Sequence, residues 1–265
     1  MFTLIQTVQA AEGISVKLNP YIVGHVAGVP ITATLLTVWL TMIVLFAVAY
    51  FAGKNPTLIP SKLQSIFEVI VGGAYDYIEG VLESKSLAKT YFPVIMTIFV
   101  FILAMNWIGL FPGVTSIGYY TGHGAESHFI PFLYPPATDL NITIAFALVA
   151  FFTIEVAGVL AIGFWKYGGK FINFKGKSIG QRVLNFIIGL IELLSELARL
   201  VSFSFRLFGN IFAGKTLLLV VMFLATPYVL PVPLIAYEFF VGFIQAFIFA
   251  ILTLFFIKLA TEEPH

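Results

Sequence analysis

Five long apolar segments constrain this chain more than any other feature of its sequence. They cover residues 31–52, 91–111, 140–166, 180–225 and 234–260. A helix needs about 20 mostly apolar residues to cross the roughly 30 Å hydrocarbon core of a bilayer, where its backbone must satisfy its own polar groups. Only 10% of the residues are charged, whereas a soluble domain carries about 25%. The sequence predicts an all-α integral membrane protein, a single membrane domain with about five membrane-crossing helices.

Residues 61–86, between the first two apolar segments, have the pattern of an amphipathic helix. Apolar residues recur there at helical spacing, and acidic residues interrupt them too often for a comfortable span. The apolar positions are Leu63, Ile66, Val69, Ile70, Tyr77, Ile78, Val81 and Leu82, and the acidic ones are Glu68, Asp76, Glu79 and Glu83. We expect this segment to lie on the membrane surface.

The distribution of basic residues predicts the orientation of the chain. Cytoplasmic connections of membrane proteins are enriched in Lys and Arg. The connections after the first and third spans hold Lys54, Lys62, Lys85 and Lys89, and Lys166, Lys170, Lys175, Lys177 and Arg182. The loop 112–136 and the turn 226–233 hold none. Five crossings then place the N-terminus outside, with residues 1–30 as an outer segment, and the C-terminus in the cytoplasm. Lys17 is the one basic residue on the outer side, and the start lacks the basic region of a signal peptide.

The fourth segment is too long for an upright span. Residues 178–225 contain no proline and would form a helix about 72 Å long at 1.5 Å per residue. The segment must therefore bend, for which Gly189, Gly209 and Gly214 offer sites, or lie strongly inclined. We expect residues 180–225 and 234–260 to pack as a long inclined hairpin.

Five polar residues of the fourth segment fall on one helical face. At 100° per residue, five side chains occupy a sector about 80° wide, and Ser202 flanks it. These five are Glu192, Glu196, Arg199, Arg206 and Asn210. Lys215 lies off this polar stripe and should face a different neighbour.

The last segment carries a shorter polar face made of Glu238, Gly242 and Gln245. Suppose that the two helices run antiparallel about a turn near residue 229. Two residues at the same depth in the membrane, one from each helix, then have numbers that add up to roughly 453 to 458. This relation predicts an ion pair between Lys215 and Glu238, and it places Arg206 near Gln245.

The third span contributes three further polar residues, Asp139, Asn141 and Glu155. Asp139 either caps the helix, since Asp favours that position, or takes part in function. Glu155 lies within the apolar run, on the same face as Asn141.

Arg206 has no acidic residue one helical turn away, so we expect its partner to come from another helix or another chain. Arg199, by contrast, is expected to pair with Glu196 or to extend toward the membrane surface. Ionisable residues within a membrane indicate function by default.

Other classes of function find little support in the sequence. There is no cysteine, and the four histidines show no metal-ligand spacing, so we expect neither a metal nor another cofactor. No nucleophile–base set and no phosphate-binding loop indicates a catalytic site in this chain, and a net charge of +1 gives no indication of nucleic-acid binding. An independent secondary transporter and a structural membrane subunit remain as alternatives, although no internal repeat of the transporter kind is visible.

Five short motifs resemble subunit a of the F-type rotary ATP synthases, in the order found in that family. They are GVPITAT at 28–34, NWIGLFPG at 106–113, TDLNIT at 138–143, SFRLFGNIFAG at 204–214 and FIQAFIFAILT at 243–253. The resemblance covers nearly the whole chain. It implies a stationary proton-channel subunit with a surface helix and an inclined hairpin, in which ATP is made on other subunits.

The resemblance also implies a role for each matching residue. Arg206 would face the carboxylate of a rotor c subunit, with Asn210 and Gln245 as polar neighbours. Glu238 would serve proton access from the outer side, Asp139 and Asn141 would lie near the outer entrance, and Glu192 would lie on the inner side. Glu196 and Ser202 flank these positions. Lys215 departs from the family, since many relatives carry an acidic residue or histidine there, and we expect it to be an electrostatic partner of Glu238.

The implied partners are the c-subunit ring, the b subunits of the peripheral stalk and the lipid bilayer, within a hetero-oligomeric complex. The implied location is a bacterial plasma membrane, with the energy-transducing membrane of an organelle as the alternative. The choice between H⁺ and Na⁺ is left open by the sequence.

Overall fold

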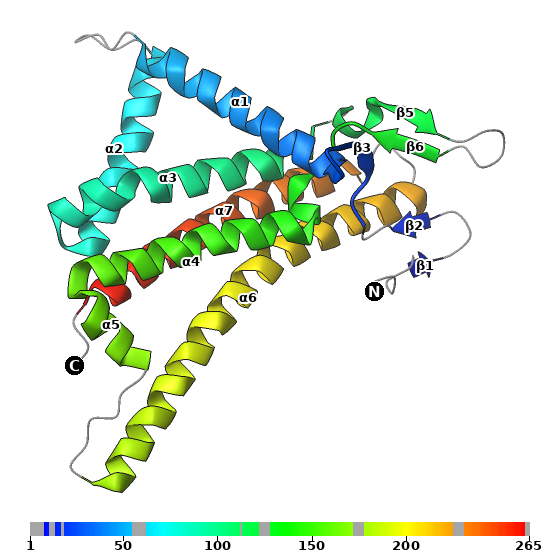
Figure 1. The fold of residues 1–265 in the computed structure, drawn as a ribbon. Coiled ribbons are helices and arrows are strands. Elements are labelled where there is room, and N and C mark those ends of the chain that lie inside the picture. The colour runs from blue at the N-terminus through cyan, green and yellow to red at the C-terminus, as the bar shows by residue number, and fades with distance from the viewer. Residues whose placement is uncertain are drawn as a thin grey trace.

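The computed structural model describes residues 8–10, 14–16, 19–54, 62–111, 113–121, 128–171, 178–224 and 231–262, and helices dominate it (Figure 1). The helices are α1 (Ala33–Gly53), α2 (Lys62–Leu82), α3 (Lys85–Ile108), α4 (Leu140–Ile162), α5 (Phe164–Phe171), α6 (Ile179–Leu224) and α7 (Pro231–Thr261). Lys17, Lys175, Lys177 and the first seven residues, used above for orientation and for the N-terminus, lie outside the described residues.

Five of these helices, α1, α3, α4, α6 and α7, are long and apolar enough to cross a membrane. This confirms the expected all-α membrane class with about five spans. Helices α3, α4 and α7 lie side by side at the centre of Figure 1. Their contact surfaces hold the most buried side chains, among them Ile102, Met105, Ile154 and Leu254.

Three antiparallel strand pairs, which the sequence analysis did not predict, gather at the end of the molecule where α6 meets α7 (Figure 1). They are β1 (Val8–Ala10) with β2 (Ile14–Val16), β3 (Ile22–Val26) with β4 (Val29–Thr32), and β5 (Gly118–Thr121) with β6 (His128–Pro131). The Tyr119 hydroxyl donates to the Val23 carbonyl at 2.9 Å and links two of the pairs. Strands this short give no periodicity strong enough to be recognised beside the long apolar helices.

Helix α2 runs across the ends of the central helices instead of alongside them (Figure 1). Only its last turns are well buried, through Ile78 and Leu82. The expected helix 61–86 ends at Leu82, because Glu83 takes a positive φ of 54° and Ser84 caps α3 by accepting from the Leu87 amide. Helix α3 consequently begins six residues before the expected span 91–111. At this turn Lys258 donates to Glu83 at 2.7 Å, and this hydrogen bond holds the pKa of Glu83 below its usual range.

Helix α6 is continuous over 46 residues, about 69 Å at 1.5 Å per residue. None of the three glycines considered as sites of a bend interrupts it. Its C-terminal half packs against α4 and α7, whereas its N-terminal end stands away from the central helices (Figure 1). Of the two alternatives left by its length, the structure has the bend, because α6 changes direction near its middle without a break in the helix (Figure 1).

The third span ends at Ile162 and not at residue 166, because Gly163 adopts a φ of 92° and reverses the chain into α5. Helix α5 is held between two glycines that permit close approach. The Tyr167 ring lies where a side chain at Gly158 would be, and the Phe171 carbonyl lies against Gly189 of α6. These contacts bring a short basic helix to the N-terminal half of α6.

Substituting Gly158 with alanine tests this packing. The new methyl group would overlap the Tyr167 ring, so we expect a loss of stability of about 1–3 kcal/mol, as for other overpacked cores. Gly168→Ala in α5 is the matched control, since nothing lies within 4 Å of that position. Thermal unfolding of the two purified variants in detergent measures the difference, and equal midpoints would contradict the packing described.

Candidate functional site: polar residues along α6

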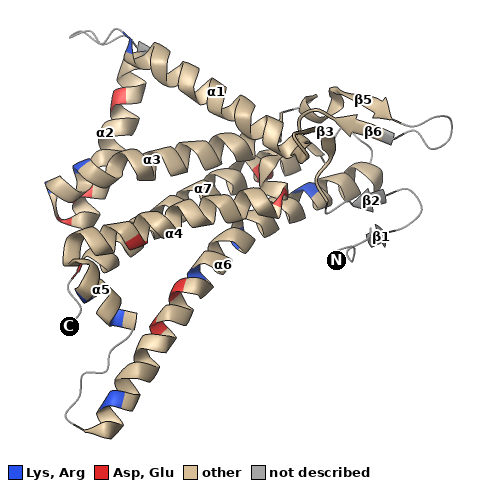
Figure 2. Ribbon diagram, viewed as in Figure 1, with Lys and Arg blue, Asp and Glu red and all other residues tan. Residues whose placement is uncertain are grey.

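Charged residues recur along α6, and the neighbouring helices add others (Figure 2). Because α6 is a continuous helix, the angular relation calculated from the sequence applies over the whole polar stripe, from Glu192 to Asn210. The structure divides these residues into an inner cluster, an arginine in the middle and an outer group.

The inner cluster joins α5 and α6 through ion pairs. Nζ of Lys170 lies 2.7 Å from Glu192 and 3.5 Å from Glu196. Nη1 of Arg199 lies 2.6 Å from the second oxygen of Glu196, which confirms that expected pair. The Arg199 guanidinium also stacks 3.7 Å over the ring of Phe256 in α7. Two carboxylates and two cations therefore neutralise one another, which offsets the cost of placing them in an apolar protein.

Lys170 was not predicted as a site residue. It entered the sequence argument only as one of the basic residues that indicate the orientation of the chain. The sequence feature that could have indicated Lys170 is the run Gly168-Gly169-Lys170. It follows the third span closely, so a turn there can bring Lys170 back toward the membrane helices. What the sequence could not supply is the reversal at Gly163, which brings Lys170 to Glu192.

Arg206 is half-buried, and its Nη2 donates to the Ser202 hydroxyl at 3.2 Å. Among the described residues no carboxylate pairs with it. Ser202 is exposed and so is Asn210, whereas Phe203, Leu207 and Ile211, about 60° to 140° round the helix from Arg206, are buried. Arg206 therefore lies at the border between the buried and the exposed sides of α6.

Asn210 connects the two helices of the hairpin. Its side-chain amide donates to Oε1 of Gln245 at 2.7 Å. The two residue numbers add up to 455, within the range derived for equal depth, so the predicted antiparallel register is confirmed. Gln245 is buried, and its own amide nitrogen has no hydrogen-bond partner among the described residues.

The predicted ion pair between Lys215 and Glu238 is wrong. Glu238 is buried and faces Gly214, where an added Cβ would overlap its carboxylate. Lys215 is the next residue of α6, about 100° further round the helix, and it points elsewhere. Its Nζ lies 3.3 Å from the centre of the Tyr134 ring and has no hydrogen-bond partner among the described residues. A cation over an aromatic face is stabilised by the charge distribution of the ring.

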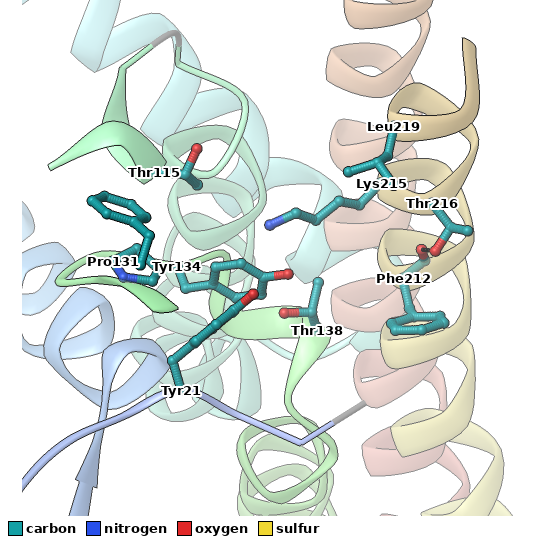
Figure 3. Close-up of a pocket in the computed structure, with 10 residues that line it drawn as sticks. Tyr21, Thr115, Pro131, Tyr134, Thr138, Phe212, Lys215, Thr216 and Leu219 are labelled. Atoms are coloured by element: carbon teal, nitrogen blue, oxygen red, sulfur yellow. Dashed lines mark hydrogen bonds between the residues drawn. The ribbon is translucent and has the colours of Figure 1, made fainter. Parts of the chain in front are cut away.

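Lys215 borders a cavity of about 240 Å³ beside the strand pairs. Figure 3 shows its side chain reaching from α6 toward Tyr134, with the hydroxyl groups of Tyr21 and Tyr134 close to each other. The lining residues are Tyr21, Thr115, Phe129, Pro131, Tyr134, Thr138, Phe212, Lys215, Thr216 and Leu219. Burial, and secondarily the neighbouring Tyr21, raises the pKa of Tyr134 to about 12, so its hydroxyl keeps its proton at neutral pH.

Asp139 caps α4 and also joins it to α1. Oδ1 accepts from the Asn141 amide at 3.0 Å and from its side chain at 3.1 Å, while Oδ2 accepts from the buried Thr34 hydroxyl at 2.8 Å. The cap expected from the sequence is therefore present. Asn141 donates both of its bonds to Oδ1 of Asp139 and does not contact α6 through either of them.

Two polar residues of α3 were missed by the sequence analysis as parts of the site. Asn106 donates to the Gly242 carbonyl and Trp107 to the Phe239 carbonyl, each at 3.0 Å. They bind the α7 backbone between Glu238 and Gln245 and so fix the depth of those residues. The sequence feature that could have indicated them is Asn106, an asparagine within an apolar span. The buried amide of such a residue requires hydrogen-bond partners.

The fold and these polar residues define a helical integral membrane protein whose ionisable groups follow one long helix, as expected of a protein that moves ions. A family model described as "ATP synthase A chain" matches residues 35–258. The chain therefore belongs to this family, that of subunit a of the F-type ATP synthases, which are proton-translocating membrane subunits.

Relatives named ATP synthase subunit a occur in several bacteria. The protein of Geobacter sulfurreducens is 32% identical over 227 residues, which cover 86% of each chain. That of Geobacter sp. strain M21 is 33% identical over the same length. The protein of Moorella thermoacetica is 30% identical over 240 residues, 91% of this chain and 95% of the relative. Nearly the whole chain is thus shared with these proteins.

Asp139→Ala tests the anchoring role of this residue. The substitution removes the helix cap, worth about 0.5–2 kcal/mol, and the bond to Thr34, worth about 1 kcal/mol. Asn141→Ala, which loses only its side-chain bond, is the control and should be less destabilised. Thermal unfolding in detergent compares the two. A stable Asp139→Ala protein that has lost proton transport would show instead that Asp139 acts chiefly in transport.

Proposed function

We propose that this chain is the stationary proton channel of a rotary ATP synthase, with two offset half-channels that open to opposite sides of the membrane and are separated by Arg206. The observation that carries the proposal is the environment of Arg206, a half-buried guanidinium of α6 without a carboxylate partner among the described residues. A charge left unpaired in an apolar span is costly, so a partner from another chain is required.

The carboxylate of a rotor c subunit fits this requirement. A guanidinium within about 4–6 Å favours the ionised form of a carboxyl group, and in low dielectric the attraction is strong. A rotor carboxyl passing Arg206 would lose its proton there and take up another after passing. The same positive charge repels protons, so protons would cross only as the rotor turns.

The outer half-channel would lead past Glu238, Asn210 and Gln245. Glu238 is buried without an ion-pair partner among the described residues, so its carboxyl is available to take and release a proton. The cavity at Lys215 and Tyr134 lies at the same end as the strand pairs, and we place the entrance there. Lys215 would contribute its charge to this entrance without carrying protons.

The inner half-channel would contain Glu192 and Glu196, which lie on the other side of Arg206 along α6. Each proton that crosses a potential of 100 mV supplies about 2.3 kcal/mol, so several protons must combine for one synthesis. The distribution of Lys and Arg favours an outer N-terminus and a cytoplasmic C-terminus, with α2 on the cytoplasmic surface. The bacterial relatives favour a bacterial plasma membrane, and the c-ring and peripheral-stalk b subunits are the proposed partners.

Arg206→Ala tests the proposal directly. We expect the variant complex to lose ATP synthesis and ATP-driven proton pumping by about two orders of magnitude or more, as when a preorganised charge is removed from a low-dielectric site. Ser202→Ala, which removes only the hydrogen bond to Arg206, should keep most of the activity. Both rates are measured in reconstituted vesicles. Full coupled synthesis by Arg206→Ala would refute the proposed role.

Gly214→Ala tests the position of Glu238. The added methyl group would occupy the space of the Glu238 carboxylate, so proton pumping should fall several-fold. Glu238→Gln should reduce it in the same way, since an amide carries no titratable proton, and Glu238→His should preserve part of it. Gly180→Ala is the matched control, because nothing lies within 4 Å of that glycine and it is in the first turn of α6, far from Arg206. Wild-type pumping by both Gly214→Ala and Glu238→Gln would remove Glu238 from the path.

A further inference from the structure

Glu155 of α4 is a carboxylic acid that the proposed path along α6 does not use. It lies in the middle of a span, and its neighbours are Tyr167, Lys170, Glu196 and Arg199. Oε1 of Glu155 and the Tyr167 hydroxyl are both buried, and the hydroxyl faces the carboxylate as its hydrogen-bond donor. Each of the other two carboxylates of this group, Glu192 and Glu196, lies within 4 Å of a cation. A buried carboxyl whose close partner is a hydroxyl and not a cation calls for an explanation.

Both cations of the inner cluster already form ion pairs with carboxylates other than Glu155. Lys170 lies between Glu192 and Glu196, and Arg199 pairs with the second oxygen of Glu196. Helix α7 contributes the Phe256 ring, over which the Arg199 guanidinium stacks. With all groups ionised the cluster would hold three carboxylates against two cations, so one negative charge would be left over. Like charges in contact favour protonation of one group, and Glu155 is the carboxylate without a cation of its own.

The packing around Glu155 depends on two specific glycines. Gly158, one turn further along α4, leaves the space that the Tyr167 ring fills, and Gly163 turns α5 back so that Tyr167 reaches α4. Burial, followed by the charge of Glu155, raises the pKa of the Tyr167 hydroxyl, which therefore stays protonated and available as a donor. Polar atoms of this kind within a membrane span are sites where water can be held.

We infer that Glu155 is a further proton-carrying residue of the inner half-channel, with Tyr167 as the group that positions it. In the direction of synthesis, a proton released from the rotor on the inner side binds the Glu155 carboxylate and forms its O–H bond. That bond then breaks as the proton passes to water at Glu192 and Glu196 and leaves to the inner compartment. In hydrolysis-driven pumping the same steps run in reverse. This role rests on the proposed function.

Glu155→Gln keeps the size of the side chain and removes its titratable proton. We expect ATP-driven proton pumping to fall several-fold at equal assembly, and its dependence on the pH of the inner compartment to weaken. Glu155→Asp should restore much of both. A merely structural carboxyl would leave the pH profile unchanged in the assembled Gln variant. Wild-type rates with a wild-type pH profile in Glu155→Gln would overturn the inference.

Access from the inner side gives a second measurement that does not depend on activity. The chain contains no cysteine, so Glu155→Cys and Val156→Cys each introduce a single thiol. Val156 is 52% exposed on the lipid side of α4 and is the matched control. In assembled complexes with the inner face outward, a charged thiosulfonate reagent should modify position 155 and spare position 156. No modification at position 155 would overturn the inference even if Glu155→Gln failed to assemble.

The two proposals fail separately. If Arg206→Ala abolishes pumping while Glu155→Gln leaves pumping and its pH profile unchanged, the role of Glu155 is wrong and the rotary channel stands. If Arg206→Ala retains coupled synthesis, the channel proposal fails, and the role of Glu155 fails with it.

Discussion

The continuous inclined helix α6 is the constraint on which the rest of the structure depends. A helix of 46 residues is more than twice as long as an upright span requires, and its apolar face must still be covered by protein or lipid. Its C-terminal half is covered by α4 and α7. Its N-terminal half stands apart (Figure 1) and receives α5 at Gly189. The polar stripe thereby runs at an angle to the central helices, with different neighbours at its two ends.

The neighbours decide which charges along α6 are neutralised. At the inner end, α5 brings Lys170 between Glu192 and Glu196, so these carboxylates are paired. In the middle, Arg206 is half-buried and keeps only a hydroxyl partner among the described residues. A low-dielectric surrounding makes the difference large, because an unpaired charge interacts strongly there with any charge that approaches. The unpaired groups are therefore where an external partner and a moving proton would have their effect.

Close helix contacts set the depth of the outer polar residues. Gly214 lets α6 approach α7 at Glu238, and Asn106 and Trp107 hold the α7 backbone from the side of α3. The bond from Asn210 to Gln245 then fixes the register of the hairpin. A shift of one turn would move Glu238 away from the only glycine that leaves room for it on that face of α6. The packing of α6 against α7 and the position of the Glu238 carboxylate thus depend on the same glycine, Gly214.

The sequence by itself determined the membrane class, the five spans, the polar stripe and the antiparallel register of the last two helices, because helical periodicity and apolar length are local properties. Tertiary structure alone decided where the span 140–166 ends and what Lys215 faces. The reversal at Gly163 depends on one backbone conformation, and it alone brings Lys170 to Glu192. Lys215 faces Tyr134 and not Glu238. Two residues at equal depth can still point to different sides of their helices, and the tertiary structure decides which neighbour each side meets.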